Sequence, residues 1–280
     1  TGVQTCALPI YRMKEYERAE AGRRLMPRLP ILARIDGKRF SRFTEGLPRP
    51  YDERLSALMV ATTRRLMEDS AALVGYTQSD EISLLFYSDD PKVQLFLDRR
   101  VQKLTSILAS MTTAYFNADL GAAIPERAGT AAFFDCRVWA VPSRDEAANT
   151  FLWREIDATK NSVSMAARAY YPHAELHSRT SAEMQELLFQ KGVNWNDYPA
   201  FFKRGTFVLR RTTQRRFSAE ELAALPPRHA ARSDPDLLVT RNELRAVELP
   251  PFGRIVNRVG VLFDGEEPVV AAPPPPAIAP

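Results

Sequence analysis

Two short acidic motifs have the residue types and spacing to hold divalent cations. Asp36 belongs to the run Arg-Ile-Asp-Gly at 34–37, and Asp80 and Glu81 belong to the run Gln-Ser-Asp-Glu-Ile-Ser at 78–83. In proteins, Mg²⁺ prefers one or two carboxylates together with substrate phosphates. Two such ions, about 3.5–4 Å apart, can clamp the attacking and leaving oxygens of a phosphoryl displacement. The two motifs therefore indicate metal-assisted phosphoryl transfer, the chemistry of a nucleotidyltransferase.

Neither motif is specific when it is taken alone. Asp-Gly is a common turn dipeptide, and the tips of hairpins are often acidic. The combination of Asp36 with Asp80 and Glu81, in this order along the chain, favours a metal site. Gly37 supports this interpretation, because a residue without a Cβ lets its carbonyl oxygen approach an ion closely.

The elements that must position these acids follow from the apolar pattern. Asp36 ends one apolar run, and the Asp80-Glu81 pair lies at the tip of a hairpin. The expected elements are strands over 30–35, 71–76, 82–87 and 133–139, a helix capped by Asp52, and an amphipathic helix with a stripe from Val93 to Tyr115. This order predicts an α+β fold, a polymerase-palm or ferredoxin-like antiparallel sheet with helices packed on it.

Composition divides the chain into four parts. Residues 1–12 fit no helix or strand pattern and resemble a translated sequencing adapter, so we expect a non-native leader and a natural start near Met13. Residues 13–140 are expected to form the palm-like catalytic domain, and 141–217 a helical and basic part that completes it. Residues 218–280 are expected to be a helical C-terminal extension with an extended proline-rich tail at 273–276.

The bulk composition limits the class of protein only loosely. The 280 residues carry a net charge of +4 and a pI near 9.1, which permits a phosphate-rich partner without requiring one. Two cysteines make neither a disulfide framework nor a zinc site, so a reducing cytoplasm is the simplest compartment. No run approaches the roughly 18 apolar residues that a membrane span needs. The N-terminus lacks the charged and apolar regions of a secretion signal.

Arg100 and Lys103 follow the acidic hairpin and lie one turn apart on the expected long helix. Arg100 falls on the apolar stripe itself. Either its aliphatic stem packs on the stripe with the charge in solvent, or its guanidinium group binds a triphosphate through paired hydrogen bonds. We favour the triphosphate, with Lys103 as a second positive charge.

Basic and aromatic residues alternate later in the chain. Lys203, Arg204, Arg210 and Arg211 are interleaved with phenylalanines at 201, 202 and 207. This pattern is typical either of a solvated basic face or of a surface that contacts a nucleic-acid backbone and stacks its bases. A polymerising site nearby favours RNA.

Together these motifs resemble a known family, the tRNA-His guanylyltransferases and their guanylyltransferase-like relatives. The resemblance runs from about residue 13 to residue 211 and keeps the family's motif order. It is carried by 13–17, 34–37 with Phe40 and Phe43, 78–83, Arg99, Arg100 and Lys103, 133–138, Trp153 and Arg154, 194–196 and 203–206.

The resemblance implies a set of site residues. Two Mg²⁺ ions would be held by Asp36, the Gly37 carbonyl and Asp80, with Glu81 supporting the site. The residues expected to bind nucleotide are Gly37, Ser79, Arg100 and Lys103, together with Lys38 and Arg49 in the loop after Gly37.

The resemblance also implies a reaction, nucleotide addition in the 3′–5′ direction to the 5′ end of tRNA. ATP would first activate a 5′ monophosphate by adenylylation, and the 3′-hydroxyl of GTP or another nucleotide would then attack that phosphorus. Metals and fixed positive charge can serve both steps. Members of the family are usually homotetramers, so the expected partners are tRNA, nucleoside triphosphates and further copies of the chain.

Departures from the family pattern bear on the substrate. A His-Ile-Asn-Asn-type segment is replaced here by residues 159–165, a usual histidine is Ser41, and a usual lysine is Arg49. This pattern resembles the bacterial and archaeal relatives, which extend 5′-truncated tRNAs by templated pairing. We therefore expect tRNA 5′-end repair ahead of guanosine addition to tRNA-His.

Two other functions remain open from the sequence. A cyclic-dinucleotide synthase would share the palm, but its hairpin would read Gly-Gly-Asp-Glu-Phe. A catalytically silent RNA-binding protein would not need both Asp36 and Asp80, since facing acids are costly without cations.

Overall fold

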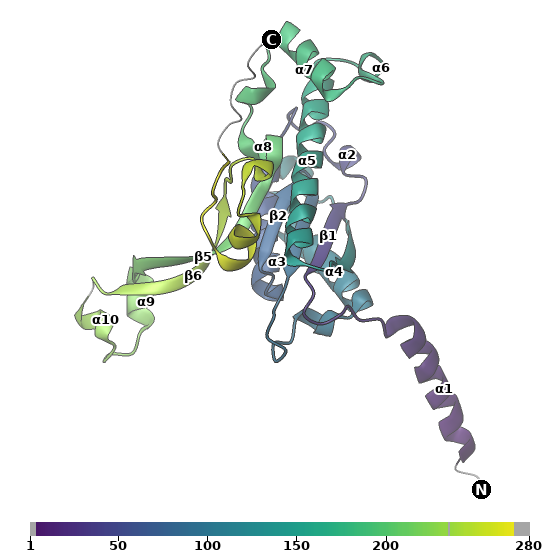
Figure 1. Cartoon of the computed structure of the whole chain (residues 1–280), viewed down its shortest axis with the longest axis vertical. Helices are drawn as coiled ribbons and strands as arrows, with labels where there is room; N and C mark the ends of the chain where they lie inside the picture. The colour runs from purple at the N-terminus through teal and green to yellow at the C-terminus, as the bar shows by residue number, and fades with distance from the viewer. Residues whose placement is uncertain (1–3, 235, 272–280) are drawn as a thin grey trace.

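The computed structural model describes residues 4–234 and 236–271 (Figure 1). One six-stranded sheet lies at its centre, in the order β4-β1-β3-β2-β5-β6, and every neighbouring pair is antiparallel. The strands are β1 Ile31–Gly37, β2 Val74–Gln78, β3 Glu81–Phe86, β4 Phe134–Ala140, β5 Thr206–Arg216 and β6 Leu238–Val247. The order of the first four strands is that of a split βαβ unit, which confirms the predicted fold class.

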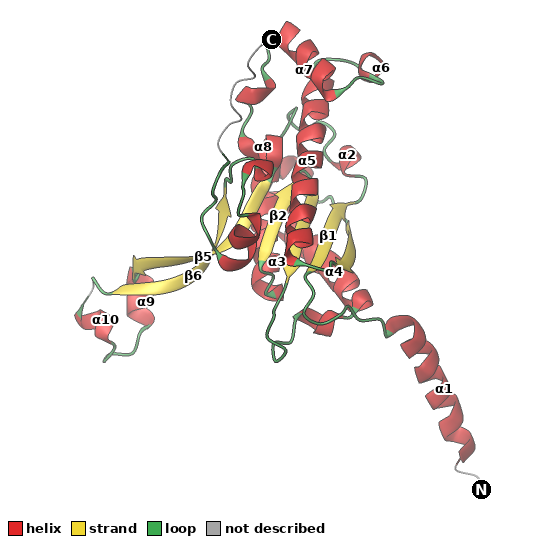
Figure 2. Ribbon diagram, viewed as in Figure 1, coloured by secondary structure: helices red, strands yellow, loops and turns green. Residues whose placement is uncertain are grey.

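Helices cover both faces of the sheet (Figure 2). α3 Glu53–Ser70 and α4 Val101–Ala123 pack on one face, where the alternating residues Ile31, Ala33 and Ile35 of β1 are buried. α5 Arg144–Arg168 lies on the other face. The side chain of Asp52 accepts a hydrogen bond from Arg54 N–H at 2.9 Å, which confirms the predicted cap of α3.

The remaining helices are short, apart from the first. They are α1 Gln4–Ala21, α2 Phe40–Phe43, α6 His173–Leu176, α7 Ser181–Gln190, α8 Ala200–Arg204, α9 Ala219–Ala224 and α10 Ala230–Ser233. α1 projects from the body of the molecule and begins at Gln4, inside the segment expected to be a non-native leader (Figure 1). The origin of that segment stays a prediction.

The C-terminal extension contributes to the sheet and to the core, which the sequence pattern does not predict. It contains the short helices α9 and α10, but it also supplies β6 and a segment at 249–264 that packs against α5 and the sheet. Phe252 and Ile255 in that segment are fully buried. The backbone N–H of Phe252 donates to the Glu155 carboxylate of α5 at 2.7 Å. The proline-rich tail lies outside the described residues.

The helix after the hairpin begins later than predicted. The apolar stripe was expected to start at Val93, but α4 begins at Val101, and Val93 is exposed. Three successive residues, Leu97, Asp98 and Arg99, have positive φ angles of 50–58°, which a right-handed α-helix cannot contain. The bridge between Arg24 and Arg100 holds this segment beside the chain that follows α1.

None of the described helices is long and apolar enough to cross a membrane.

Gly205 joins α8 to β5 in a conformation that only glycine adopts. Its φ of 75° and ψ of −171° lie in that region, and an added Cβ would stand 2.6 Å from the Thr77 carbonyl oxygen. We therefore expect Gly205→Ala to lower the free energy of unfolding by about 3 kcal/mol, measured by urea denaturation.

Gly192 provides the matched control. Its φ is also positive, at 74°, but an added Cβ would meet nothing within 4 Å. Gly192→Ala should therefore cost only about 1 kcal/mol. Equal losses for the two variants would contradict the steric explanation.

Glu155 makes the stability of the fold depend on pH. Burial raises its pKa to about 7, although the Phe252 N–H and then Arg204 lower it. Because this value exceeds the 4.5 of a free glutamate, the folded protein binds the proton more tightly than the unfolded chain. The resulting stabilisation is complete below about pH 4.5 and is lost as the pH rises through about 7.

This loss should be roughly 3 kcal/mol in unfolding experiments. Glu155→Gln keeps an acceptor for Phe252 but cannot ionise, so its stability should change less over the same pH range. Glu146→Gln, an exposed position on the same helix, serves as control. An unchanged pH slope in Glu155→Gln would refute this assignment.

Candidate active site

The two acidic motifs meet at one end of the sheet. β1 ends at Gly37, whose N–H donates to the carbonyl oxygen of Asp80 in the β2–β3 turn at 3.2 Å. Asp36 lies directly opposite Glu81 in the antiparallel pair of β1 and β3. The strand register therefore confirms that the two acidic motifs meet, while the roles of the acids stay predictions.

Gly37 occupies a position with no room for a side chain. A Cβ there would lie 2.4 Å from the Phe40 ring and 2.8 Å from Asp80 Oδ2. The glycine is therefore needed for the Asp80 carboxylate to lie against the end of β1. This close approach also places the backbone of Gly37 beside the acids.

Like charges surround Asp80. Burial, and next the charge of Asp36, raise the pKa of the Asp80 carboxyl to about 6, while its own backbone N–H and Ser79 oppose the shift. Glu81 adds a smaller rise. The folded chain thus holds Asp36 and Asp80 together at an electrostatic cost, which a bound cation would reverse.

Glu81 differs from the other two acids because arginines occupy its carboxylate. Arg154 of α5 donates from Nε to Oε1 at 2.6 Å and from Nη2 to Oε2 at 2.9 Å, and both side chains are 3% exposed. Arg34 Nε lies 2.8 Å from Oε2, but its N–H is not aligned for a hydrogen bond. Glu81 is therefore held in an ion-pair network, with Asp36 and Asp80 left beside each other.

Asp36, Asp80 and the Gly37 carbonyl are suitable ligands for Mg²⁺. All are hard oxygen donors, and the missing Cβ of Gly37 lets the Asp80 carboxylate lie against its backbone. No cluster of three or more His, Cys, Asp or Glu side chains is arranged to hold a metal by itself within residues 4–234 and 236–271. The acids thus suit an ion that is completed by substrate phosphates rather than a closed protein cage.

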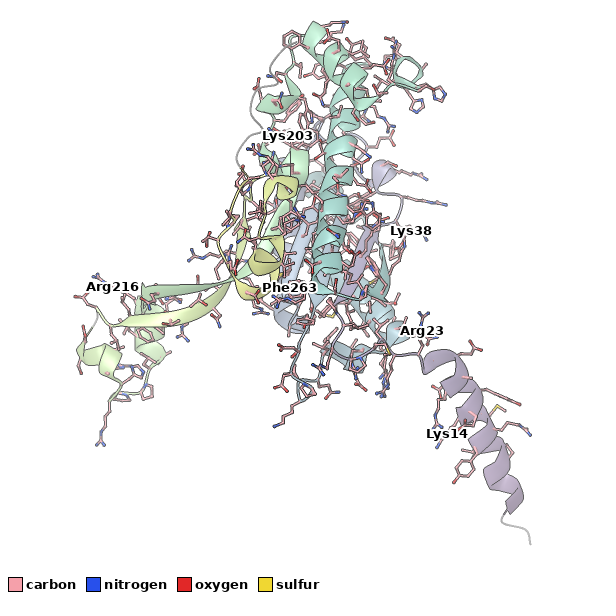
Figure 3. The ribbon with its side chains drawn as sticks, viewed as in Figure 1. Lys14, Arg23, Lys38, Lys203, Arg216 and Phe263 are labelled. Atoms are coloured by element: carbon pink, nitrogen blue, oxygen red, sulfur yellow. The ribbon has the colours of Figure 1, made fainter. Side chains whose placement is uncertain are left out.

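Two adjoining pockets open beside the acids. One is lined by Arg49, Ser79, Asp80 and Arg168 together with residues from α2 and the loop after it. Lys38 lies at the surface at the same end of the sheet (Figure 3). Arg49 and Ser79, both predicted to bind nucleotide, therefore line the same pocket as Asp80.

The other pocket lies between α3, α5 and α8 and is mostly apolar. Phe201 and Phe202 line one side, and Ser79 lies at the boundary with the first pocket. Asn161 and Ser162 of α5 also face it, and both belong to the segment that departs from the family pattern. A flat, partly apolar group such as a nucleobase suits this space.

Arg100 and Lys103 do not join this site within one chain. Phe96, just before them, stacks on Phe86 with ring centres 6.3 Å apart, and Phe86 pairs with Ile31 at the start of β1. The five residue steps from Ile31 to Asp36 span roughly 17 Å of strand. Their contact with a triphosphate stays a prediction.

The four basic residues predicted to bind RNA fall into two places. Lys203 and Arg204 end α8 near the second pocket, where the Lys203 ammonium is bonded to the Asn196 carbonyl (Figure 3). Arg210 and Arg211 lie further along β5, where they donate to the carbonyl oxygens of Met67 and Gly265. RNA contact by these residues is untested, and they do not form one continuous cluster.

Arg34 and Arg154 were assigned no role from the sequence. Both belong to segments of the family resemblance, and a signal for Arg154 was present. It falls on the buried stripe of α5 between Phe151 and Ala158, where an arginine needs a charged partner. Its partner, Glu81, lies 73 residues away in the chain, so the pair was not visible in any local pattern.

The palm-like sheet and the acid pair at its end define a nucleotidyltransferase class of site. The family profile described as tRNAHis guanylyltransferase matches residues 10–142.

Comparison with solved structures supports this match. A bacterial tRNA(His) guanylyltransferase (Thg1)-like protein in complex with ATP is 39% identical, with a TM-score of 0.67, over 71% of this chain and 86% of that one. A bacterial tRNA(His) guanylyltransferase (Thg1)-like protein in complex with GTP is 31% identical, with a TM-score of 0.65. The match covers 86% of this chain and 92% of that one.

A curated relative extends the comparison to eukaryotes. The probable tRNA(His) guanylyltransferase of Drosophila melanogaster is 29% identical over 213 residues, which cover 71% of this chain and 72% of the relative. The chain belongs to the tRNA(His) guanylyltransferase family, a family of nucleotidyltransferases.

The crowding of Asp36 and Asp80 predicts a specific response to metal. Saturating Mg²⁺ should raise the thermal unfolding temperature of the natural sequence by a few degrees, equivalent to about 1 kcal/mol. Asp80→Asn removes one of two like charges, so it should be more stable than the natural sequence without Mg²⁺ and show no Mg²⁺ response. Asp119→Asn, exposed on α4, should keep the full response. An equal response in Asp80→Asn would contradict the metal site.

Proposed function

We propose that this protein is a Mg²⁺-dependent nucleotidyltransferase that adds nucleotides in the 3′–5′ direction to the 5′ end of tRNA. The observation that carries the proposal is the convergence of Asp36, Gly37 and Asp80 at one end of a palm-like sheet, beside a pocket suited to a nucleotide. Membership of the tRNA(His) guanylyltransferase family supports the substrate.

Asp36, the Gly37 carbonyl and Asp80 would hold two Mg²⁺ ions. When bound, these ions supply charge stabilisation at the reacting phosphorus and lower the pKa of the attacking hydroxyl. The side chains around them orient the substrates. Ser79 and Arg49 line the pocket next to Asp80 and would position a triphosphate, and Lys38 at the surface adds a positive charge nearby.

ATP and GTP are the proposed nucleotide substrates. Similar bacterial proteins have been solved in complex with each of them, and their structures match most of this chain. The 5′ monophosphate of the tRNA would attack the α-phosphorus of ATP, which releases pyrophosphate and leaves an adenylylated 5′ end. The 3′-hydroxyl of GTP, or of another nucleotide, would then displace AMP from that phosphorus and form the new phosphodiester bond.

Repair of 5′-truncated tRNA is favoured over addition of one guanosine to tRNA-His. The segment at 159–165 departs from the family pattern for tRNA-His enzymes, and its Asn161, Ser162 and Met165 face the apolar pocket. Ser162 also accepts a hydrogen bond from the Trp195 indole at 3.1 Å, which ties this segment to the Asn-Trp-Asn motif. The departure therefore lies where a base would be selected.

Other parts of the proposal rest on family membership. They are tRNA contact by Lys203, Arg204, Arg210 and Arg211, triphosphate contact by Arg100 and Lys103, a homotetramer, and a cytoplasmic location. In a homotetramer, the distance between Arg100 and Asp36 within one chain would not prevent contact with the same nucleotide.

A direct test offers the purified full chain two tRNAs, each with ATP, GTP and Mg²⁺. One is full-length tRNA-His and the other lacks its first nucleotide. Faster extension of the truncated tRNA would support repair, and faster extension of tRNA-His would support guanylylation. A cyclic product from GTP alone would instead indicate a cyclic-dinucleotide synthase.

The acid pair gives a sharper prediction in the same assay. Asp36→Ala and Asp80→Ala should each lower nucleotide addition by at least about 10³-fold, because the cation ligands are lost. Binding of tRNA, measured by filter retention, should change little. Asp119→Ala is the matched control and should retain activity. Activity that survives both site substitutions would refute the metal assignment, and an inactive natural sequence that binds tRNA would indicate a silent RNA-binding protein.

A further inference from the structure

Glu81 is close enough to Asp36 to compete for the same cation. The two residues face each other across β1 and β3, so their Cβ atoms lie about 5 Å apart on one face of the sheet. A free carboxylate at this position would readily become a third acidic ligand. The arrangement around Glu81 therefore decides how many acids the cation site offers.

Arg154 occupies the whole Glu81 carboxylate. Its two hydrogen bonds engage both oxygens in the bidentate geometry that fixes an arginine and an acid in one plane. The third guanidinium nitrogen, Nη1, donates to Asp157 at 2.8 Å. Each of the three nitrogen atoms of the Arg154 side chain therefore makes a hydrogen bond to a carboxylate.

Neighbouring residues keep this pair away from water. Both side chains are 3% exposed, and the Trp153 ring lies 4.4 Å from the Arg154 guanidinium carbon. Breaking a buried ion pair by removing one partner is strongly destabilising, because the other charge remains without compensation. Without Arg154, Glu81 would keep only Arg34, whose N–H is not aligned for a hydrogen bond, so a cation held by Asp36 would be its next partner.

We propose that Arg154 is a positioning residue that withholds Glu81 from the cations. The cation site then consists of Asp36, Asp80 and the Gly37 carbonyl, and the remaining coordination positions stay free for substrate phosphates. Arg34 Nε lies 2.8 Å from the Glu81 carboxylate, and its positive charge also keeps Glu81 away from the cations. The proposal deepens the proposed function, because it rests on the same cation site and assigns Glu81 a role other than ligand.

The test is Mn²⁺ binding by the full chain without nucleotide, followed by electron paramagnetic resonance. Arg154→Met should bind Mn²⁺ about tenfold more tightly than the natural sequence, because Glu81 becomes a ligand. It should also raise the KM for ATP more than it lowers kcat, because the added ligand takes a position that phosphate needs. A purely structural role for Arg154 would instead weaken Mn²⁺ binding.

A double variant keeps the test decisive if Arg154→Met does not fold. Glu81→Met with Arg154→Met replaces the buried pair by apolar side chains of similar volume, which proteins tolerate. Its dissociation constant for Mn²⁺ should stay within about threefold of that of the natural sequence. A tenfold larger dissociation constant would show that Glu81 is a ligand in the natural sequence and would overturn the proposal.

Two single variants separate this inference from the proposed function. Asp36→Asn should weaken Mn²⁺ binding at least about tenfold, and an unchanged constant would refute the cation site itself. Arg144→Met removes an arginine from the same helix that is paired with Asp264, far from Glu81, and should leave Mn²⁺ binding unchanged. Suppose that Asp36→Asn weakens Mn²⁺ binding and Arg144→Met does not, while Arg154→Met also binds Mn²⁺ more weakly than the natural sequence. The cation site then stands, and only the proposed role of Arg154 is refuted.

Discussion

The structure is organised around negative charge that is gathered at one end of a sheet. Asp36, Asp80 and Glu81 come from two motifs that β1, β2 and β3 bring together. Two of these acids repel each other, and the third is neutralised by arginines. Such an arrangement is unfavourable for folding by itself, so its presence is best explained by what binds there.

Much of this organisation was predictable because it depends on local signals. Apolar runs that end in Asp36 or turn at Asp80 predicted one strand and one hairpin, and the strand order then required the two acidic motifs to meet. The cap at Asp52 followed from a side chain that bonds its own helix. These features require only residues that are near one another in the chain, or the pairing of neighbouring strands.

Features that depend on contacts distant in sequence were not predictable. The partner of Glu81 lies on α5. β6 follows β5 only after α9 and α10, and most of its residues are exposed, so its apolar pattern is weak. The late start of α4 has another cause. Its apolar stripe continues through residues 93–100, where a bridge to Arg24 and positive φ angles replace the helix. Hydrophobic periodicity cannot detect such a competing contact.

Beyond Leu209, β5 leaves the sheet and pairs only with β6, so the two strands continue as an isolated ribbon toward Arg216 (Figure 3). A two-stranded ribbon without a core is marginal in water. Here Arg215 joins Glu243 at 2.9 Å and Glu221 of α9 at 2.7 Å. Because such exposed attractions are screened by dissolved ions, the cohesion of this arm varies with ionic strength, while that of the apolar body does not.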